Sequence, residues 1–413
     1  MNYFIKNIHV NKLFHLENFD IPIENKNCPN LIITGKNGSG KTVLLNAISE
    51  FLNYVKMQKN LHFLSFYDSL NYWQDYLRNA KNQEEHMQAQ DQIKTYQKWI
   101  DLLYSKVDIQ FVNVSTLIEK YEKEDFILSF YQADRKVRMS EPRNPTKPVY
   151  NKKGDVKEIA TDQFLNFLSD LKIQEALARN EKQIKDADEI NAWFVGFEDL
   201  LKQIFQDDNL KLKFNYKDYS FKICSGEKMF KFTEVSDGFA AVLDIVADLI
   251  LKMQESNSLT KNYLKEGIVL IDEIETHLHL GLQKIIMPLL TQIFPNIQFI
   301  ITTHSPFVLS SMPNAVAYDL EHKKPIEDLT NYSYESLAEG YFGVRAESSD
   351  VRHRLNKVKE LLEKEELSVS ETDTLKKYMR DFDNIPEAVS PSLIGEYLKL
   401  KLKYMNKIKE LMQ

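Results

Sequence analysis

The chain has 413 residues, of which 43% are hydrophobic and 27% are charged, as in a folded globular protein. A formal net charge of -7 argues against a protein that is coated with nucleic acid, and leaves room only for a local basic patch. The two cysteines are too few for a disulfide framework, and no apolar run approaches the roughly 18 residues that a membrane span needs.

The first 35 residues are predicted to form strands. The opening segment YFIKNIHV alternates apolar and polar residues, and LIITG is a short apolar run. This start lacks the continuous apolar core of a signal peptide. We therefore expect the protein to lie in the cytoplasm, with no membrane anchor.

A glycine-rich turn follows these strands and precedes a helix that is predicted to reach about residue 54. The turn matches the pattern G-x-x-x-x-G-K-[ST], which the sequence fills with Gly35, Lys36, Asn37, Gly38, Ser39, Gly40, Lys41 and Thr42. Glycine lets such a loop curl so that its N–H groups point at a phosphate, and the helix N-terminus adds positive charge. Lys41 would reach the β- and γ-phosphates, and the Thr42 hydroxyl is a hard ligand for Mg²⁺. The pattern therefore predicts binding of ATP with Mg²⁺.

The middle of the chain is predicted to alternate between helices and short strands. A polar helical stretch covers roughly residues 67–105, the strands VDIQFVNV and DFILSFY follow, and one or two helices cover residues 161–206. Between Asp134 and Lys157, eight Lys or Arg residues stand against three acids. This segment could contact a nucleic-acid backbone, an acidic protein partner or solvent alone.

Three β-rich runs, LKLKFNY, YSFKIC and MFKFTEV, lead into a long apolar helix, GFAAVLDIVADLILKM. Ser236, Asp237 and Gly238 lie at the start of that helix. Ser and Asp are favoured N-caps, and Gly lets a phosphate approach the free N–H groups. Helix capping alone would explain these residues. Their position in the chain, between the glycine-rich turn and the acids described next, favours a role at the nucleotide.

Two short apolar runs, GIVLIDE and NIQFIITTH, flank an apolar helix and predict a βαβ unit with buried parallel strands. In a P-loop enzyme, Asp272 would hold the Mg²⁺ shell and Glu273 would polarise the attacking water. His304 follows the second strand, where it could contact the γ-phosphate and order that water. Thr302 or Thr303 could be the polar sensor instead.

The remaining clusters of ionisable residues are interpreted as parts of loops and surfaces. His277 and His279 lie near acids and would allow a metal site, but a loop beside the nucleotide and between subunits is the stronger interpretation. From about Ser333 the chain is predicted to be helical and charged. Asp381 and Asp383 are interpreted as solvated acids there, so we expect no nuclease module. The lysines of the last helix are expected to face solvent or another subunit; they are Lys399, Lys401, Lys403, Lys407 and Lys409.

These motifs together resemble ABC-type ATPases. VSDGF looks like the ABC signature, whose usual form is LSGGQ, while TGKNGSGKT, LIDEIETHLH and ITTHSP resemble the heads of the RecF and SMC group. The chain also resembles stand-alone ATPases of the overcoming-lysogenisation-defect type, which occur in bacterial anti-phage systems such as PARIS, Septu and some retrons. The resemblance covers about 1–55, 105–140 and 205–320. Asp237 and Phe239 depart from the usual Gly and Gln, which suits the soluble group better than transporters.

The resemblance implies an α/β fold: a P-loop NTPase of the ABC type with an antiparallel β subdomain. It implies a head over residues 1–330 and a helical C-terminal region over 331–413. Helical insertions in the head, at about 55–105 and 155–207, would form a short lid or a partner-docking surface. It also implies a homodimer or higher homo-oligomer with shared sites. One subunit would supply Lys41, Thr42, Gln132, Asp272, Glu273 and His304, and the other would supply Ser236 and Gly238.

In the family a glutamine after a central strand senses Mg²⁺ and water, and Gln132 is the candidate here, with Arg135 as an alternative phosphate or partner contact. The resemblance further implies an ATP-hydrolysing subunit that senses phage infection and controls a separate effector, a nuclease or toxin encoded nearby, through ATP-gated oligomerisation. A DNA-repair or chromosome-associated ATPase that binds DNA is one alternative. An ATP-stabilised scaffold with very slow hydrolysis is another.

Overall fold

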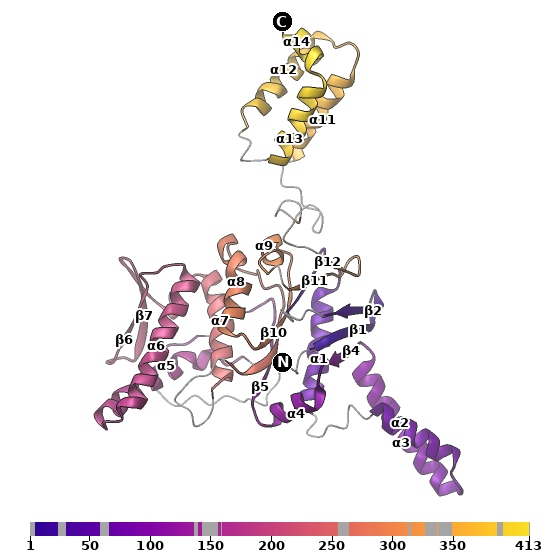
Figure 1. The fold of residues 1–413 in the computed structure, drawn as a ribbon, viewed down its shortest axis with the longest axis vertical. Coiled ribbons are helices and arrows are strands. Elements are labelled where there is room, and N and C mark those ends of the chain that lie inside the picture. Colours follow the sequence, from indigo (N-terminus) through magenta and orange to yellow (C-terminus); the bar gives the residue numbers. More distant parts are fainter. Residues whose placement is uncertain are drawn as a thin grey trace. The chain divides into compact units, whose positions relative to one another are not determined.

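A computed structural model gives the fold of the chain. It describes residues 5–23, 30–57, 66–135, 139–142, 156–157, 159–254, 264–312, 315–326, 337, 349–385 and 391–412. The chain forms two compact units, Met1–Tyr332 and Ser333–Gln413, each of which has its own core (Figure 1). Among the described residues, no helix is both long enough and apolar enough to cross a membrane.

A six-stranded sheet forms the centre of the first unit. Its strand order is β12-β11-β3-β10-β9-β5, and every neighbouring pair is parallel except β11 with β12. The strands are β3 (Leu31–Thr34), β5 (Phe126–Tyr131), β9 (Glu266–Ile271), β10 (Ile297–Thr302), β11 (Val316–Asp319) and β12 (Lys324–Ile326). Every residue of β3, β5 and β10 is buried, as expected for parallel strands with both faces covered. The predicted βαβ unit is β9, α8 (Leu280–Ile293) and β10.

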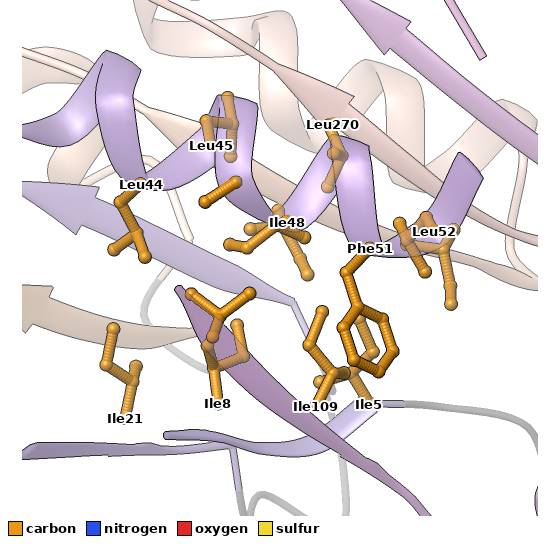
Figure 2. Close-up of a cluster of buried hydrophobic side chains, with 14 of the residues drawn as sticks. Ile5, Ile8, Ile21, Leu44, Leu45, Ile48, Phe51, Leu52, Ile109 and Leu270 are labelled. Atoms are coloured by element: carbon orange, nitrogen blue, oxygen red, sulfur yellow. The ribbon is translucent and has the colours of Figure 1, made fainter. Parts of the chain in front are cut away.

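Helix α1 (Lys41–Met57) joins this sheet to a second, antiparallel one of order β2-β1-β4. The small sheet comprises β1 (Ile5–Leu13), β2 (Leu16–Pro22) and β4 (Val107–Phe111). Figure 2 shows apolar side chains of α1, at helical spacing, packing against Ile5, Ile8 and Ile109 of this sheet and near Leu270 of β9. Each such side chain, fully buried, contributes about 1.5–3 kcal/mol. This packing fixes the N-terminus of α1, and with it the glycine-rich turn, at one end of the central sheet.

Helical hairpins and a third sheet complete the first unit. The polar stretch forms α2 (Phe66–Arg78) and α3 (Gln83–Tyr104), followed by α4 (Val114–Glu122) after β4. The second predicted helical stretch forms two helices, α5 (Phe164–Asn180) and α6 (Ile184–Phe205), preceded by the short η2 (Thr161–Gln163). The three β-rich runs form an antiparallel sheet of β6 (Lys211–Asn215), β7 (Ser220–Ser225) and β8 (Lys228–Lys231). A turn of η3 (Phe232–Glu234) leads to the buried helix α7 (Asp237–Lys252), and α9 (Pro306–Leu309) follows β10. The predicted α/β fold with an antiparallel subdomain is confirmed.

The second unit is a helical bundle. It contains α11 (Ser349–Glu363), α12 (Val369–Asp383), α13 (Pro391–Lys403) and α14 (Met405–Met412). Its core includes Leu355, Val358, Leu375, Met379, Phe382 and Tyr397. Asp381 and Asp383 are partly exposed and pair with Arg354 at 3.3 Å and Lys401 at 2.7 Å. They are therefore surface ion-pair acids of a bundle.

Because this unit has a hydrophobic core of its own, we expect residues 333–413 to fold alone and unfold cooperatively in urea. Leu355→Ala should lower the free energy of unfolding by about 2–5 kcal/mol, since Leu355 is 1% exposed. Val369→Ala should change it by less than about 0.5 kcal/mol, because Val369 is 82% exposed. Circular dichroism measures both. A fragment without a cooperative transition would contradict the expectation.

Candidate nucleotide-binding site

The glycine-rich turn between β3 and α1 is tightly curled. Gly35, Gly38 and Gly40 have φ angles of +139°, +82° and +96°, which side-chain-bearing residues rarely adopt. A Cβ atom on Gly35 would lie 2.9 Å from Ser39 Oγ, and one on Gly40 would lie 2.8 Å from Leu16 Cδ1. Gly35 and Gly40 are therefore required both by their backbone angles and by the atoms that pack against them.

The Lys41 ammonium group lies inside this curl. Nζ donates to the carbonyl oxygens of Gly35 at 2.8 Å and Lys36 at 3.0 Å, and the residue is 4% exposed. Burial lowers the pKa of Lys41 to about 8, although the carboxylates of Glu273 and Glu275 oppose that shift. A buried cation of this kind is stabilised by an anion that reaches the turn.

The Asp272 carboxylate joins the ends of three elements. Its Oδ1 accepts from the Thr302 hydroxyl at 2.6 Å and from the Thr42 hydroxyl at 3.3 Å. Thr302 also accepts from the backbone N–H of Glu273 at 2.8 Å. Thr303 donates to Glu275 at 2.8 Å. Both threonines thus hold acids in place, which favours His304 over them as the group facing the nucleotide.

The side chains of Glu273 and His304 face each other in the cleft beside Lys41. Glu273 Oε1 lies 3.9 Å from His304 Nε2, too far for a direct hydrogen bond and suitable for a shared water. Glu273 has a φ of +42°, a strained backbone for a residue with a side chain. Burial, and then the charge of Lys41, lower the pKa of His304, so the imidazole is mainly neutral at pH 7. Glu275 accepts from the backbone N–H of His304 and fixes its position.

Arg135 forms hydrogen bonds to the backbone of the strained turn that contains Glu273. The residue is 7% exposed, and its guanidinium donates to the carbonyl oxygens of Asp272 at 2.9 Å, Glu273 at 3.3 Å and Ile274 at 3.4 Å. The alternative expectation of a phosphate contact does not fit this buried position. Sequence reasoning missed the supporting role because no local pattern marks it.

Gln132 stands at the end of β5, next to this arrangement. It is exposed, and its carbonyl oxygen accepts from Arg135 at 3.2 Å. Gln132 is not among the described residues that line the cleft beside Lys41. The role expected for Gln132 therefore stays a prediction.

An open cleft of about 350 Å³ lies over the turn. It is lined by Leu13, Phe14, His15, Asn37, Gly38, Gly40, Lys41, Thr42, Val43, Glu273 and His304. The lining combines polar and charged groups, such as Lys41, Glu273 and His304, with the apolar Leu13, Phe14 and Val43. Phe14 is 81% exposed in the β1–β2 turn and has a φ of +54°, a feature that the alternating sequence pattern did not indicate. Polar and apolar groups in one cleft suit a phosphate chain joined to a flat base.

The oxygen donors beside Lys41 fit Mg²⁺. The hydroxyl of Thr42 and the carboxylate of Asp272 are hard oxygen ligands from different elements that already lie 3.3 Å apart. Mg²⁺ is commonly bound by one or two carboxylates with substrate phosphates supplying further ligands. By contrast, no group of three or more His, Cys, Asp or Glu residues within the described ranges could hold a metal ion. His279 instead caps α8, with Nδ1 accepting from Leu282 N–H at 3.3 Å, so the metal interpretation of His277 and His279 is not supported.

The start of α7 lacks a side-chain capping hydrogen bond. Ser236 occupies the N-cap position, is exposed, and makes no side-chain capping hydrogen bond. Gly238 is buried, and a Cβ atom there would lie 2.8 Å from the carbonyl oxygen of His277. Glycine at this position therefore has a packing reason, which the expectation of phosphate approach did not include. Neither residue is among those described as lining the cleft.

Parts of the chain match a family model and several known proteins. Residues 162–310 match the family model described as "AAA domain, putative AbiEii toxin, Type IV TA system". The Retron Ec83 probable ATPase of Escherichia coli is 30% identical over 242 residues, 56% of this chain and 42% of the relative. The Septu protein PtuA of Bacillus mycoides (strain KBAB4) is 38% identical over 95 residues, 23% of this chain and 13% of the relative.

A solved SmcHead structure, bound to the C-winged helix domain of ScpA, aligns with 79% of this chain and 96% of its own, at a TM-score of 0.37 and 12% identity. The chain spans less than half the length of the two curated relatives. The resemblance to ATPases of anti-phage systems, expected from the motifs, is confirmed.

Arg135→Met should lower the free energy of unfolding by at least about 3 kcal/mol, because each buried carbonyl left without a donor costs about 1–3 kcal/mol. Arg179→Met is the matched control: Arg179 is exposed and pairs with Glu175 and Asp188 at 3.2 Å, surface contacts worth about 0.5 kcal/mol each. Urea unfolding measures both variants. Equal destabilisation by the two changes would contradict the supporting role of Arg135.

Proposed function

We propose that this chain is an ABC-type ATPase subunit that binds ATP with Mg²⁺ and hydrolyses it at a site completed by a second copy. The observation that carries the proposal is the convergence of Lys41, Asp272, Glu273 and His304 at the carboxyl ends of neighbouring parallel strands. Ligands of open α/β sheets bind at this edge. The matches to an AAA domain model and to a probable ATPase support it.

The turn holds the triphosphate. Backbone N–H groups of residues 35–40 and the Lys41 ammonium would bind the β- and γ-phosphates, replacing carbonyl contacts that now stabilise the ammonium group. Thr42 and Asp272 would hold Mg²⁺, which neutralises charge on the β- and γ-oxygens when bound. The base would lie against the exposed ring of Phe14, one of the apolar residues that line the cleft.

Glu273 and His304 act on the attacking water. Glu273 accepts a proton from water as the water oxygen bonds to the γ-phosphorus, and the bond to the β–γ bridging oxygen breaks to release ADP. Neutral His304 orients this water and contacts the γ-phosphate. The 3.9 Å separation of the two side chains leaves room for one water between them.

A second copy would supply Ser236. Its hydroxyl is exposed at a helix N-terminus and makes no capping bond, which suits a phosphate presented by another subunit. ATP would then hold two subunits together, and hydrolysis would remove the anion on which α7 docks. The expected result is a nucleotide-gated homodimer or higher homo-oligomer.

The relatives support a proposal for the cellular role. Similarity to a retron ATPase and to a Septu protein supports a place in anti-phage defence. ATP-dependent assembly would control a separate effector protein, a nuclease or toxin encoded nearby. Loss of phage protection on deletion of this chain, with the effector gene intact, tests this role.

Glu273→Gln should lower kcat for ATP by about 10²–10⁴-fold while leaving ATP binding intact, because only the proton acceptor is lost. Glu266→Gln is the control, since Glu266 lies at the start of β9 and pairs with Lys120 at 3.2 Å. Phosphate release measures turnover. Unchanged turnover in Glu273→Gln would refute the assigned role.

Triphosphate binding should take up a proton at alkaline pH. The pKa of Lys41 is lowered to about 8, so the ammonium is mostly deprotonated at pH 9, and an anion beside it raises that pKa again. Titration calorimetry in two buffers of different ionisation enthalpy should give a larger proton uptake at pH 9 than at pH 7.

Lys36→Met should leave this uptake unchanged, because Lys36 is exposed and pairs with Glu321 at 2.9 Å. An uptake that does not depend on pH would show that Lys41 does not meet the phosphates.

A further inference from the structure

The sheet β6–β7–β8 has one packed face and one open face. Phe221 and Ile223 of β7 are buried, and the Phe221 ring stacks on Phe194 of α6 at 6.0 Å. Figure 1 shows β6 and β7 beside α6. Side chains alternate along a strand, so the neighbours of Phe221 and Ile223 point to the opposite face. That face carries lysines.

The strand register places three of these lysines in one row. Lys213 of β6 lies opposite Lys222 of β7, and Lys222 lies opposite Lys231 of β8. Neighbouring strands are about 4.8 Å apart, so three positive charges fall within roughly 10 Å. Like charges directly opposite each other destabilise a sheet. An anion across the row would offset that repulsion.

The row has few acidic partners of its own. Lys213 is exposed and Lys222 is half-buried, and neither has an ion pair with a described residue. Lys231 lies 4.0 Å from Glu141, and Lys211, also on this face, pairs with Glu198 at 3.0 Å. Residues 211–231 contain six lysines and two acids, Asp218 and Glu227, in a chain of net charge -7. The positive charge is therefore local to this sheet.

Apolar groups on the sheet and in its β6–β7 turn indicate which anion fits. Met229 on the lysine-bearing face of β8 is 53% exposed, and Tyr216, in the β6–β7 turn beyond the end of the row, is 73% exposed. A basic surface with an exposed aromatic ring is the usual platform for a nucleic-acid strand, since the ring stacks on a base while lysines contact phosphates. An acidic protein segment would pair with the lysines but would give the Tyr216 ring nothing to stack on.

We propose that the open face of β6–β7–β8 binds the sugar–phosphate backbone of a nucleic acid, with Lys213, Lys222 and Lys231 on phosphates and Tyr216 on a base. Lysines act as point charges, so binding would not depend on sequence. These residues do not line the described cleft, so the proposal stands independently of ATP hydrolysis. The basic segment from Asp134 to Lys157, considered from the sequence for such contact, lies largely outside the described residues.

Fluorescence anisotropy of the full chain with a 30-nucleotide single-stranded DNA, the same RNA, or the duplex tests the surface between 50 and 200 mM KCl. We expect binding whose log affinity falls with log salt at a slope of about -2 for a single strand, from three phosphate contacts. The triple change Lys213→Gln, Lys222→Gln and Lys231→Gln should lower affinity at least about tenfold and flatten the slope. Tyr216→Ala should weaken single strands more than duplex.

The matched control changes Lys81, Lys94 and Lys98 to Gln, three exposed lysines with no ion pair to a described residue. It removes the same charge and should leave binding unchanged. Thermal unfolding of both triple variants checks that they fold, and the triple change of the row to Arg should retain binding. Loss of binding in both Gln variants to the same extent, or no salt-dependent binding of any of the three nucleic acids, would overturn the proposal. So would poly-L-glutamate binding as tightly as DNA with the same dependence on the row.

Discussion

The buried ammonium group of Lys41 is the constraint on which the site depends. It lies among backbone carbonyl oxygens and close to more than one carboxylate, and burial lowers its pKa. The turn keeps its shape because Gly35 and Gly40 fit where a side chain would collide. A multivalent anion in the turn would restore the charge of the ammonium group. The curled turn, the start of α1 and the acids after β9 are thus all arranged around one buried positive charge.

A second layer of contacts holds the acids in position. Thr302 ties Asp272 to the backbone of Glu273, and Arg135 binds the carbonyl oxygens of the same turn from inside. This support keeps Glu273 in a strained conformation that points its carboxylate toward His304. Strain of this kind persists where the surroundings over-determine it. A neighbouring subunit that docks through Ser236 would therefore meet a turn that is already organised for the reaction.

Sequence and structure agree where the chemistry is local. The glycine-rich turn, the acids after β9 and the βαβ unit could be predicted because each depends on residues that are close together in the chain. The contacts of Arg135, Phe14 and Gly238 could not be predicted, because they join distant segments, as Gly238 does with the carbonyl of His277. The lysine row was missed for a related reason: its charges lie on separate strands and become one patch only through the register.

The central claim is that each nucleotide is shared between the turn of one subunit and the Ser236 helix of another. Mixing two inactive variants, Lys41→Ala and Ser236→Arg, tests it most directly by ATP turnover. Subunits that exchange into mixed dimers would have one intact site in each mixed pair, so an equal mixture should regain about a quarter of wild-type turnover. A mixture that forms mixed dimers yet stays as inactive as its two components would contradict the claim.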